Sequence, residues 1–213
     1  MALSLINKIT EKIILKELKK ISHKDVKVLD LGCGDGRLSL KLKKMGFEVY
    51  ATDIVSDPFK NKDNIRYSQL NFNEGLKYPK NFFDIVISME VIEHIENPWG
   101  FIDEIYGLIK PNGKLILSTP NVENYISRLL YLVSKRFVSF GPDLSYWNKT
   151  KNIVIDKHKT PIFHVFFKEM IYQKFNIEKH ISNGVFPLFN LNTHYTNPNI
   201  GISKIYILKK NEK

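Results

Sequence analysis

The stretch VLDLGCGDG, residues 28–36, places three glycines at alternate positions directly after a run of apolar residues. Gly32, Gly34 and Gly36 let the backbone turn sharply and approach a ligand, because glycine has no Cβ and adopts positive φ freely. A strand that ends in such a turn and leads into a helix is typical of nucleotide-cofactor sites. The dinucleotide fingerprint Gly-x-Gly-x-x-Gly does not fit, since the third glycine comes one residue early and position 37 is Arg.

Two carboxylates flank this turn and bear on the choice of cofactor. Asp30 and Asp35 would repel a pyrophosphate, but they would attract a ligand that carries an amino group and a sulfonium. The loop therefore favours S-adenosylmethionine over NAD. Asp53 ends the next apolar segment, where a carboxylate can accept hydrogen bonds from both ribose hydroxyls of either cofactor.

Short apolar segments alternate with helical periodicity along most of the chain. Apolar residues at steps of three and four among charges predict an amphipathic helix within residues 1–22. Further helices are expected at 38–45, 102–109 and 164–175, and strands at 26–32, 47–53, 65–71, 82–89, 113–120, 176–182 and 202–210. This alternation predicts an α/β three-layer sandwich, Rossmann-like, with a mostly parallel sheet covered on both faces.

We expect residues 1–213 to form a single domain with one insertion. The regular alternation lapses in residues 121–161, after the fifth strand, where a lid over the carboxyl ends of the strands could form. Ile126, Leu129, Leu130 and Val133 share one helical face there, and the aromatic, polar stretch RFVSFGPDLSYWNKTKN follows.

Composition bears on the cellular location of the protein and on its cysteine chemistry. No run approaches the roughly 18 apolar residues of a membrane span, and the N-terminal segment mixes Lys and Glu into its apolar pattern, so we expect a cytoplasmic protein. Peripheral membrane contact stays an open alternative. The single cysteine, Cys33, has no partner for a disulfide or a structural zinc site.

The net charge of +10 comes from 32 Lys and Arg against 22 Asp and Glu, and it admits an anionic partner. The lysines are scattered along the chain, however, which favours a solvated surface. No aromatic-basic stripe or RNA-binding motif is present, and "SMEV" stands where DNA amino-methylating enzymes carry Asn-Pro-Pro-Tyr. These observations argue against a nucleic acid substrate.

Four segments in order, "VLDLGCGDG", "VYATDI", "FDIVISMEVIEHIENP" and "LIKPNGKLILSTPN", resemble the successive motifs of class I S-adenosylmethionine-dependent methyltransferases over about residues 26 to 121. The resemblance implies a seven-stranded sheet whose last strand runs antiparallel. Within that superfamily "NFNEGL", "STPN", "TPIFH" and "SYW" are similar to the branch of MetW proteins, ubiquinone-type O-methyltransferases and bacterial glycan methyltransferases. The predicted lid matches none of these closely.

The resemblance also implies a donor site. Asp30 and Gly32 would contact the methionine part of the donor, Asp53 the ribose, and Glu90 the ammonium group, with residues 88–91 closing that side. Asn71 stands where the family often has Asp, and its amide oxygen can still accept a hydrogen bond from adenine. The complete set of expected cofactor-binding residues is Asp30, Gly32, Cys33, Gly34, Asp53, Ile54, Leu70, Asn71, Met89 and Glu90.

Methyl transfer is an in-line displacement, so the enzyme mainly aligns the nucleophile, and a base removes its proton. His94 and His164 are the two candidate catalytic bases. His158 and His180 are interpreted as surface residues. No metal is expected from the spacing of His, Asp and Glu, although Glu90, Glu93 and His94 leave a divalent ion as an alternative.

The sequence therefore predicts methyl transfer from S-adenosylmethionine, with S-adenosylhomocysteine as product, to an oxygen of a small-molecule or glycan-like acceptor. Nitrogen is the alternative acceptor atom. Tyr146, Trp147 and Phe163 are expected to shape the acceptor pocket. A MetW-type protein that binds the cofactor and acts through a partner is the second hypothesis, and an NAD-dependent oxidoreductase is the third. The sequence does not predict an oligomeric state.

Overall fold

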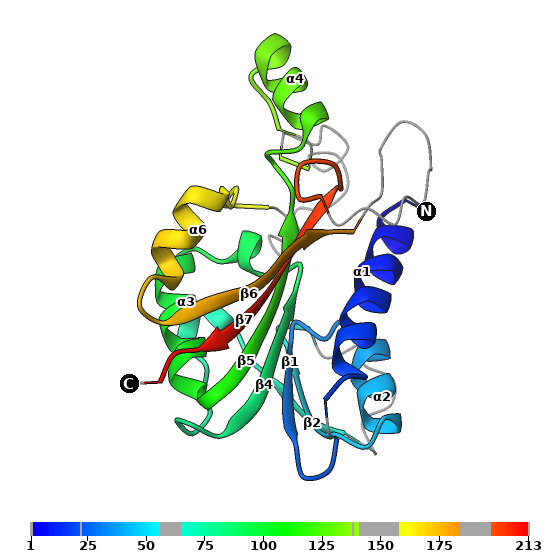
Figure 1. Cartoon of the computed structure of the whole chain (residues 1–213), viewed down its shortest axis with the longest axis vertical. Helices are drawn as coiled ribbons and strands as arrows, with labels where there is room; N and C mark the ends of the chain where they lie inside the picture. Colours follow the sequence, from blue (N-terminus) through cyan, green and yellow to red (C-terminus); the bar gives the residue numbers. More distant parts are fainter. Residues whose placement is uncertain are drawn as a thin grey trace.

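The computed structural model describes residues 2–21, 23–55, 65–137, 139–140, 158–183 and 197–212, with side chains from residue 7 onward. Seven strands form one sheet in the order β3-β2-β1-β4-β5-β7-β6 (Figure 1). β7 pairs antiparallel with both of its neighbours, and the other pairs are parallel, as predicted. The strands are β1 (Lys27–Leu31), β2 (Glu48–Asp53), β3 (Arg66–Gln69), β4 (Phe83–Met89), β5 (Ile109–Pro120), β6 (Phe175–Ser182) and β7 (Ser203–Lys210).

Helices cover both faces of this sheet. α1 (Ala2–Leu18) and α2 (Arg37–Lys44) lie on one face, and α3 (Pro98–Leu108) and α6 (His164–Ile171) lie on the other (Figure 1). Each face has its own apolar core, so the strands between them are buried from both sides. The predicted three-layer sandwich is therefore confirmed.

β1 is an interior strand of the sheet and lies between β2 and β4. Val28 packs into the core under α1 and α2, whereas Leu29 and Leu31 pack into the core under α3. All three are fully buried, which explains why this segment reads as a continuous apolar run rather than an alternating one. Leu31 pairs with Thr52 of β2 and with Ser88 of β4, so these strands end at the same edge of the sheet.

Some element boundaries differ from the predictions. α3 begins at Pro98 rather than Ile102, because the Asn97 side chain caps it by accepting a hydrogen bond from the Gly100 amide at 3.0 Å. β5 begins at Ile109 rather than Gly113, with an irregular register where it meets β4. α6 ends at Ile171 rather than Phe175, since Gln173 adopts a positive φ that no helix continues through.

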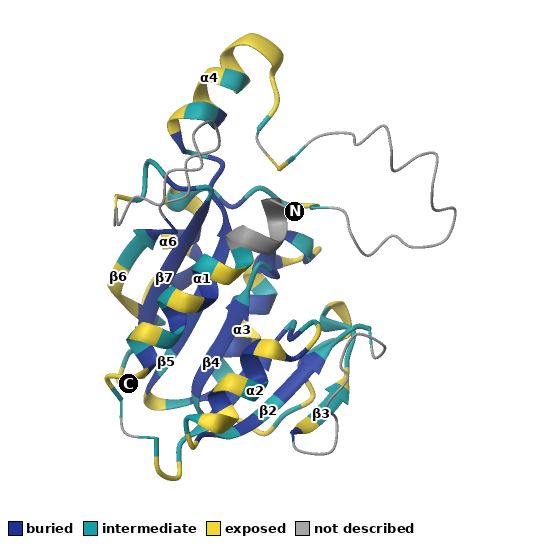
Figure 2. Cartoon of the chain, turned by 90° about the vertical axis from the view of Figure 1, so that its right-hand side faces the viewer, coloured by how far each residue is buried: buried dark blue, intermediate teal, exposed yellow. Residues whose placement is uncertain are grey.

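One further helix, α4 (Tyr125–Ser134), stands out from the edge of the sheet beyond the carboxyl end of β5 (Figures 1 and 2). Asn124 caps it by accepting a hydrogen bond from the Ser127 amide at 2.8 Å. The helical face predicted for this segment is not a buried one, because Leu129 and Val133 are largely exposed. The rest of the predicted lid, residues 141–157 with Tyr146 and Trp147, lies outside the described residues.

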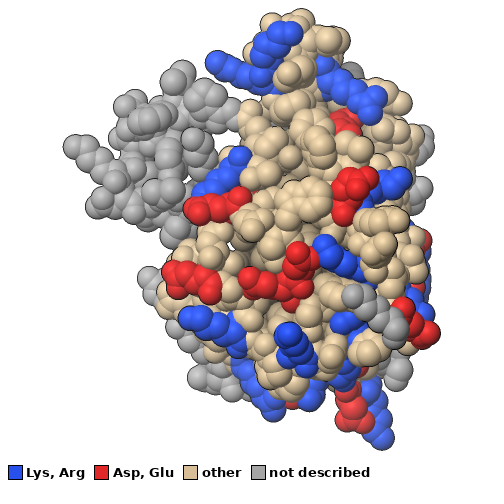
Figure 3. Space-filling model, turned by 90° about the vertical axis from the view of Figure 1, so that its left-hand side faces the viewer, with Lys and Arg blue, Asp and Glu red and all other residues tan. Residues whose placement is uncertain are grey.

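The surface carries charges of both signs. On the face drawn in Figure 3, Lys and Arg are interspersed with Asp and Glu over most of the area, as the scattered lysines of the sequence predict. Among the helices of the described ranges, we find none that is both long and apolar enough to span a bilayer.

Lys210, the last residue of β7, ties the sheet to α3. Its side chain is buried, and Nζ donates hydrogen bonds to the carbonyls of Tyr106 and Ile109 at 2.8 and 2.6 Å and to Asn81 Oδ1 at 3.1 Å. The ammonium group also lies 4.2 Å from the centre of the Tyr106 ring. Lys210 thus satisfies carbonyl groups at the end of α3 that have no partner within the helix.

We expect Lys210→Met to lower the free energy of unfolding by about 2–3 kcal/mol, the range for losing hydrogen bonds from a charged donor to buried oxygens. Lys209→Met in the same strand is the matched control, and it should change stability by less than about 0.5 kcal/mol. Urea unfolding of the three proteins measures both values. Equal effects of the two substitutions would contradict the role given to Lys210.

Candidate functional site

The glycine loop after β1 is tied to the end of β2. The amides of Gly32 and Cys33 both donate to the Thr52 carbonyl, at 2.8 and 3.1 Å, and the Gly34 amide donates to Asp53 Oδ2 at 2.8 Å. Gly32 and Gly34 have φ of 73° and 52°, a region that favours glycine. The structure therefore brings together the predicted loop and the predicted carboxylate.

Asp53 is half-buried and keeps capacity for a ligand. Its Oδ1 accepts a hydrogen bond from the Val55 amide at 3.1 Å, but a carboxylate has about four acceptor positions, so positions remain for ribose hydroxyls. Two other predicted residues flank it: Ile54 follows directly, and the Leu70 amide donates to the Asp53 carbonyl at 3.0 Å. These residues form one wall at the edge of the sheet.

Asn71 has a local structural role. Its Oδ1 accepts a hydrogen bond from the Asn73 amide at 3.2 Å, and its Nδ2 donates to Glu74 Oε1 at 2.8 Å, which caps the short helix η2 (Phe72–Glu74). The amide oxygen can still accept a second hydrogen bond. The predicted contact with adenine stays a prediction.

Asp30 lies beneath the loop rather than at its surface. Its side chain is buried, and it accepts a hydrogen bond of 2.5 Å from Ser39 Oγ of α2. Burial raises the pKa of this carboxyl to about 7, and the charge of Asp53 adds to the effect. Burial also raises the pKa of the Cys33 thiol, as does Asp30, so Cys33 is not a reactive thiolate at neutral pH.

The turn after β4 is strained and packs on the glycine loop. Glu90 has a φ of 56°, which is rare for a residue with a long side chain. Its amide donates to the Ser118 carbonyl at 3.1 Å, and Ser118 Oγ donates to Glu90 Oε1 at 2.7 Å. A Cβ on Gly32 would lie only 2.3 Å from Val91 Cγ2, so the turn that contains Met89, Glu90 and Val91 is held directly against the loop.

Glu93 is the most deeply buried carboxyl of this turn. Thr119 Oγ1 donates to its Oε2 at 3.2 Å, and burial together with the nearby Glu90 raises its pKa well above the usual range. The backbone carbonyl of Glu93 accepts hydrogen bonds from the amides of Lys159 and Thr160, at 2.7 and 3.0 Å. This contact attaches the segment that begins at His158 to the turn.

As a result, the rings of His94 and His158 meet edge to face, with centres 4.8 Å apart. The interpretation of His158 as a surface residue is wrong, because the Glu93 contact draws it against the turn, where it is half-buried. One ligand atom each from Glu93, His94 and His158 lies within 4.8 Å of the others, a set that could hold a divalent cation such as zinc. The spacing along the chain gave no signal for it, since His158 is remote in sequence.

His164 occupies a different part of the sheet. Its amide donates to Glu123 Oε2 at 2.7 Å, and its Nδ1 lies 3.0 Å from the Tyr206 hydroxyl. β7, which carries Tyr206, is three strands away from β1, or about 14 Å at the usual strand spacing. The structure therefore does not bring His164 to the glycine loop, whereas it does bring the turn of His94.

The ring of His180 stacks on the rings of His164 and Tyr206, each at a centre separation of 4.4 Å, and those two rings lie 5.8 Å apart. His180 is interpreted from the sequence as a surface residue; β6 places its ring against His164 of α6, and the side chain is half-buried. Burial lowers its pKa to about 4 and also lowers the pKa of His164, so both rings are neutral at pH 7. This cluster is a packing unit of α6, β6 and β7.

The arrangement fits S-adenosylmethionine. A Cβ on Gly34 would meet no heavy atom within 4 Å, so there is open space beside the loop. The Asp53 carboxylate offers acceptors for a ribose, and the Glu90 carboxyl offers an anion for a positively charged group. Gly32, Gly34, Asp53 and Glu90 are the residues that would hold this cofactor.

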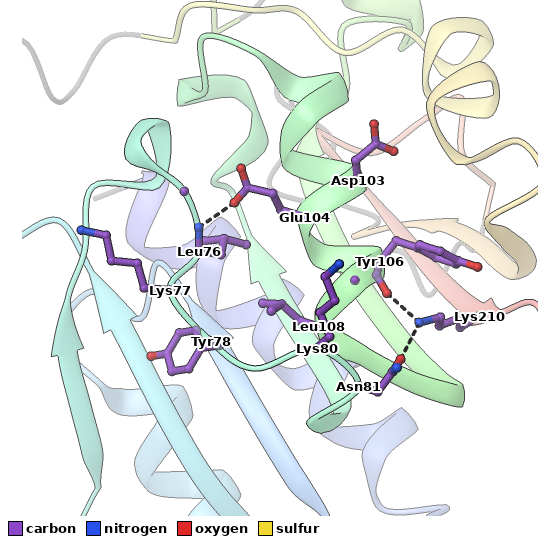
Figure 4. Close-up of a pocket in the computed structure, with 12 residues that line it drawn as sticks. Leu76, Lys77, Tyr78, Lys80, Asn81, Asp103, Glu104, Tyr106, Leu108 and Lys210 are labelled. Atoms are coloured by element: carbon purple, nitrogen blue, oxygen red, sulfur yellow. Dashed lines mark hydrogen bonds between the residues drawn. The ribbon is translucent and has the colours of Figure 1, made fainter.

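A separate groove of about 760 Å³ lies at the opposite edge of the sheet (Figure 4). It runs between the segment before β4 and the last turns of α3, where Glu104 Oε2 accepts a hydrogen bond from the Leu76 amide at 2.6 Å. Lys210 closes one end of it. Because the glycine loop follows the carboxyl end of β1, this groove is not part of the candidate site.

Comparisons with known proteins agree with this geometry. The family model described as a methyltransferase domain matches residues 5–169. The ubiquinone biosynthesis O-methyltransferase of Rickettsia felis is 32% identical over 172 residues, which cover 75% of this chain and 70% of that protein. The enzyme of the same name from Coxiella burnetii is 36% identical over 64% of this chain and 59% of its own length.

A solved structure with a related fold is the putative S-adenosylmethionine-dependent methyltransferase of Listeria monocytogenes. It superimposes with a TM-score of 0.63 at 19% identity, covering 95% of this chain and 99% of the Listeria chain. At this identity the likeness bears on the fold alone.

We expect Gly32→Ala to destabilise the protein by about 2 kcal/mol more than Gly34→Ala. Both substitutions force alanine into a positive φ, which costs about 1–2 kcal/mol, but only the first drives a methyl group into Val91. Urea unfolding of the two variants gives the difference. Equal losses would show that Val91 does not pack on the loop.

Asp30 gives the protein a specific pH dependence. Its folded pKa of about 7 lies above the unfolded value of 3.8, so the folded state holds a proton that the unfolded state has lost, and stability falls as pH rises between about 4 and 7. Asp30→Asn should remove this fall. We expect the variant to gain on the order of 4 kcal/mol relative to the parent between about pH 4 and about pH 8, since each pKa unit corresponds to about 1.4 kcal/mol. A difference that is constant over this range would refute the raised pKa.

Proposed function

The chain belongs to the methyltransferase-domain family, and from this membership we propose that it transfers a methyl group from S-adenosylmethionine to an oxygen of a small-molecule acceptor. It is an S-adenosylmethionine-dependent enzyme. The acceptor atom and the acceptor class are the parts that we propose. The relatives support oxygen, since they are named as O-methyltransferases, but their matched stretches reach only 70% and 59% of their lengths.

The observation that carries the proposal is the packing of Val91 on Gly32. It fixes the turn after β4 against the glycine loop, so His94, three residues after Val91, belongs to the same edge of the sheet as Asp53. A donor held by Asp53 and Glu90 and a nucleophile bound near His94 would then be close together, which is most of what methyl transfer requires.

We assign a role to each of these residues. S-adenosylmethionine, when bound, supplies an electrophilic methyl group on a sulfonium. Asp53 would accept hydrogen bonds from the ribose, and the Glu90 carboxylate would face the positive charge. His94 takes the proton from the acceptor hydroxyl as the oxygen–carbon bond forms and the sulfur–carbon bond breaks, which leaves S-adenosylhomocysteine. His164 has no part in this step, because it packs against Tyr206 instead.

Two alternatives are kept distinct from this proposal. A glycan hydroxyl is also an oxygen nucleophile and belongs to the same reaction type, whereas an amine would make the enzyme an N-methyltransferase. The relatives reported above do not support a MetW-type protein without its own methyl transfer.

The test is formation of S-adenosylhomocysteine with a panel of catechols, simple sugars and amines. We expect turnover with a hydroxyl compound, and we expect His94→Ala to lower kcat by about 10²-fold or more while the dissociation constant for S-adenosylmethionine changes less than about twofold. His164→Ala is the matched control: it should lower stability, because it loses the Tyr206 contact, and leave kcat within about threefold.

The opposite ranking, with kcat lost only in His164→Ala, would transfer the role of base to His164. Turnover with amines alone would replace the proposed acceptor. Assays with EDTA and with added zinc or magnesium separate two roles of His94, since a base works in EDTA and a ligand of a required cation does not.

A further inference from the structure

α4 is apolar on the side that faces solvent. Tyr125, Leu129, Leu132 and Val133 lie on this outer side and are 55%, 64%, 70% and 78% exposed. Ser127, by contrast, is buried and faces the body of the protein, where its amide bonds to Asn124. An ordinary surface helix shows the reverse pattern, with apolar residues inside and polar residues outside.

The other side of α4 contacts α6 through aromatic rings. The rings of Tyr131 and Phe137 stack at 4.7 Å, Phe137 meets Phe163 at 5.4 Å, and Phe163 meets Phe166 at 6.1 Å. Phe166 and its neighbour Val165 are themselves more than half exposed. Aromatic contacts therefore hold the inner side of α4 against the first turn of α6, and exposed apolar side chains are present on both helices. A contiguous apolar surface such as the outer side of α4 marks a site of interaction.

The charges around α4 are of one sign. Arg128, Lys135 and Arg136 are exposed, and residues 125–137 contain no Asp or Glu. Figure 3 shows the corresponding region at the top of the molecule, with blue side chains beside a tan tip, whereas the middle of the same face is mixed. Apolar side chains bordered by Lys and Arg are complementary to the acyl chains and phosphates of an anionic bilayer.

The position of the helix suits this partner. α4 projects past the sheet (Figures 1 and 2), so a flat surface can reach the outer side of this helix without meeting the sheet. We propose that α4 docks the protein on the surface of anionic membranes, with its apolar side in the interface and its arginines and lysine on lipid phosphates. A second copy of the chain is a poorer occupant, because a twofold contact would bring the same cations face to face.

Docking in this way has a consequence for the reaction. α4 follows β5 directly, so the carboxyl edge of the sheet, with Glu90 and His94, faces the membrane side of the molecule. We infer that an amphiphilic hydroxyl compound held in the bilayer is a better acceptor than the soluble hydroxyl compounds of the panel. This second step rests on the proposed function, whereas membrane docking does not.

The test uses sedimentation of the full chain with phosphatidylcholine vesicles that contain or lack phosphatidylglycerol, without any cofactor. We expect binding to the anionic vesicles only, weakened by salt. The double variant L129Q/L132Q should bind at least about tenfold more weakly, because it removes two of the side chains that would enter the interface. Tyr172→Gln is the matched control, since Tyr172 is equally exposed but lies at the far end of α6.

Absence of binding, or equal binding by L129Q/L132Q and the parent, would overturn the proposal. Both positions are exposed, so the variant should fold, and its thermal unfolding verifies this. Light scattering measures the oligomeric state and so tests the alternative occupant, a second copy of the chain. A parent dimer that is dissociated by L129Q/L132Q would assign this face to a dimer interface. Vesicle binding without turnover of any acceptor would retain the docking and refute the proposed function alone.

Discussion

The close approach of Gly32 and Val91 sets the geometry of the whole carboxyl edge of the sheet. Gly32 belongs to the loop after β1 and Val91 to the turn after β4, and no side chain fits between them. The loop is bonded in addition to Thr52 and Asp53 at the end of β2. Three strands therefore present their ends as one rigid unit, and the strained backbone of Glu90 is held in place by this packing and by Ser118.

A second feature of the carboxyl edge of the sheet is the burial of its carboxyl side chains. Asp30 and Glu93 are removed from water and Glu90 is half-buried, and burial raises the pKa of all three. Such groups ionise most readily when a positive charge arrives beside them. A cationic donor or a divalent ion bound here would therefore release protons to solvent, and the affinity of the site for cations should rise with pH.

The fold was largely predictable from the sequence, because buried parallel strands and glycine turns leave strong local patterns. The loop with Gly32 and Gly34 and the carboxylate of Asp53 came together as expected, since the ends of adjacent parallel strands meet at one edge. The histidines were less predictable. His158 reaches His94 through the backbone of Glu93, and His180 stacks on His164 of α6, so both positions depend on tertiary contacts that have no local signature. The outward apolar face of α4 was missed for a related reason: periodicity shows that a helix has an apolar side, but not which way that side points.

The contacts that assemble the site also join remote parts of the chain. Thr160 Oγ1 donates to the Ile95 carbonyl across 65 residues, next to the bonds from Lys159 and Thr160 to Glu93. Closing so long a loop carries an entropic cost that must be met before the contact contributes any stability. The turn of Glu93 and His94 is thus expected to complete its structure late in folding, after the central strands have paired. A ligand that contacts both the glycine loop and this turn binds only the fully folded site. It would therefore stabilise the folded site relative to forms in which this turn is not yet folded.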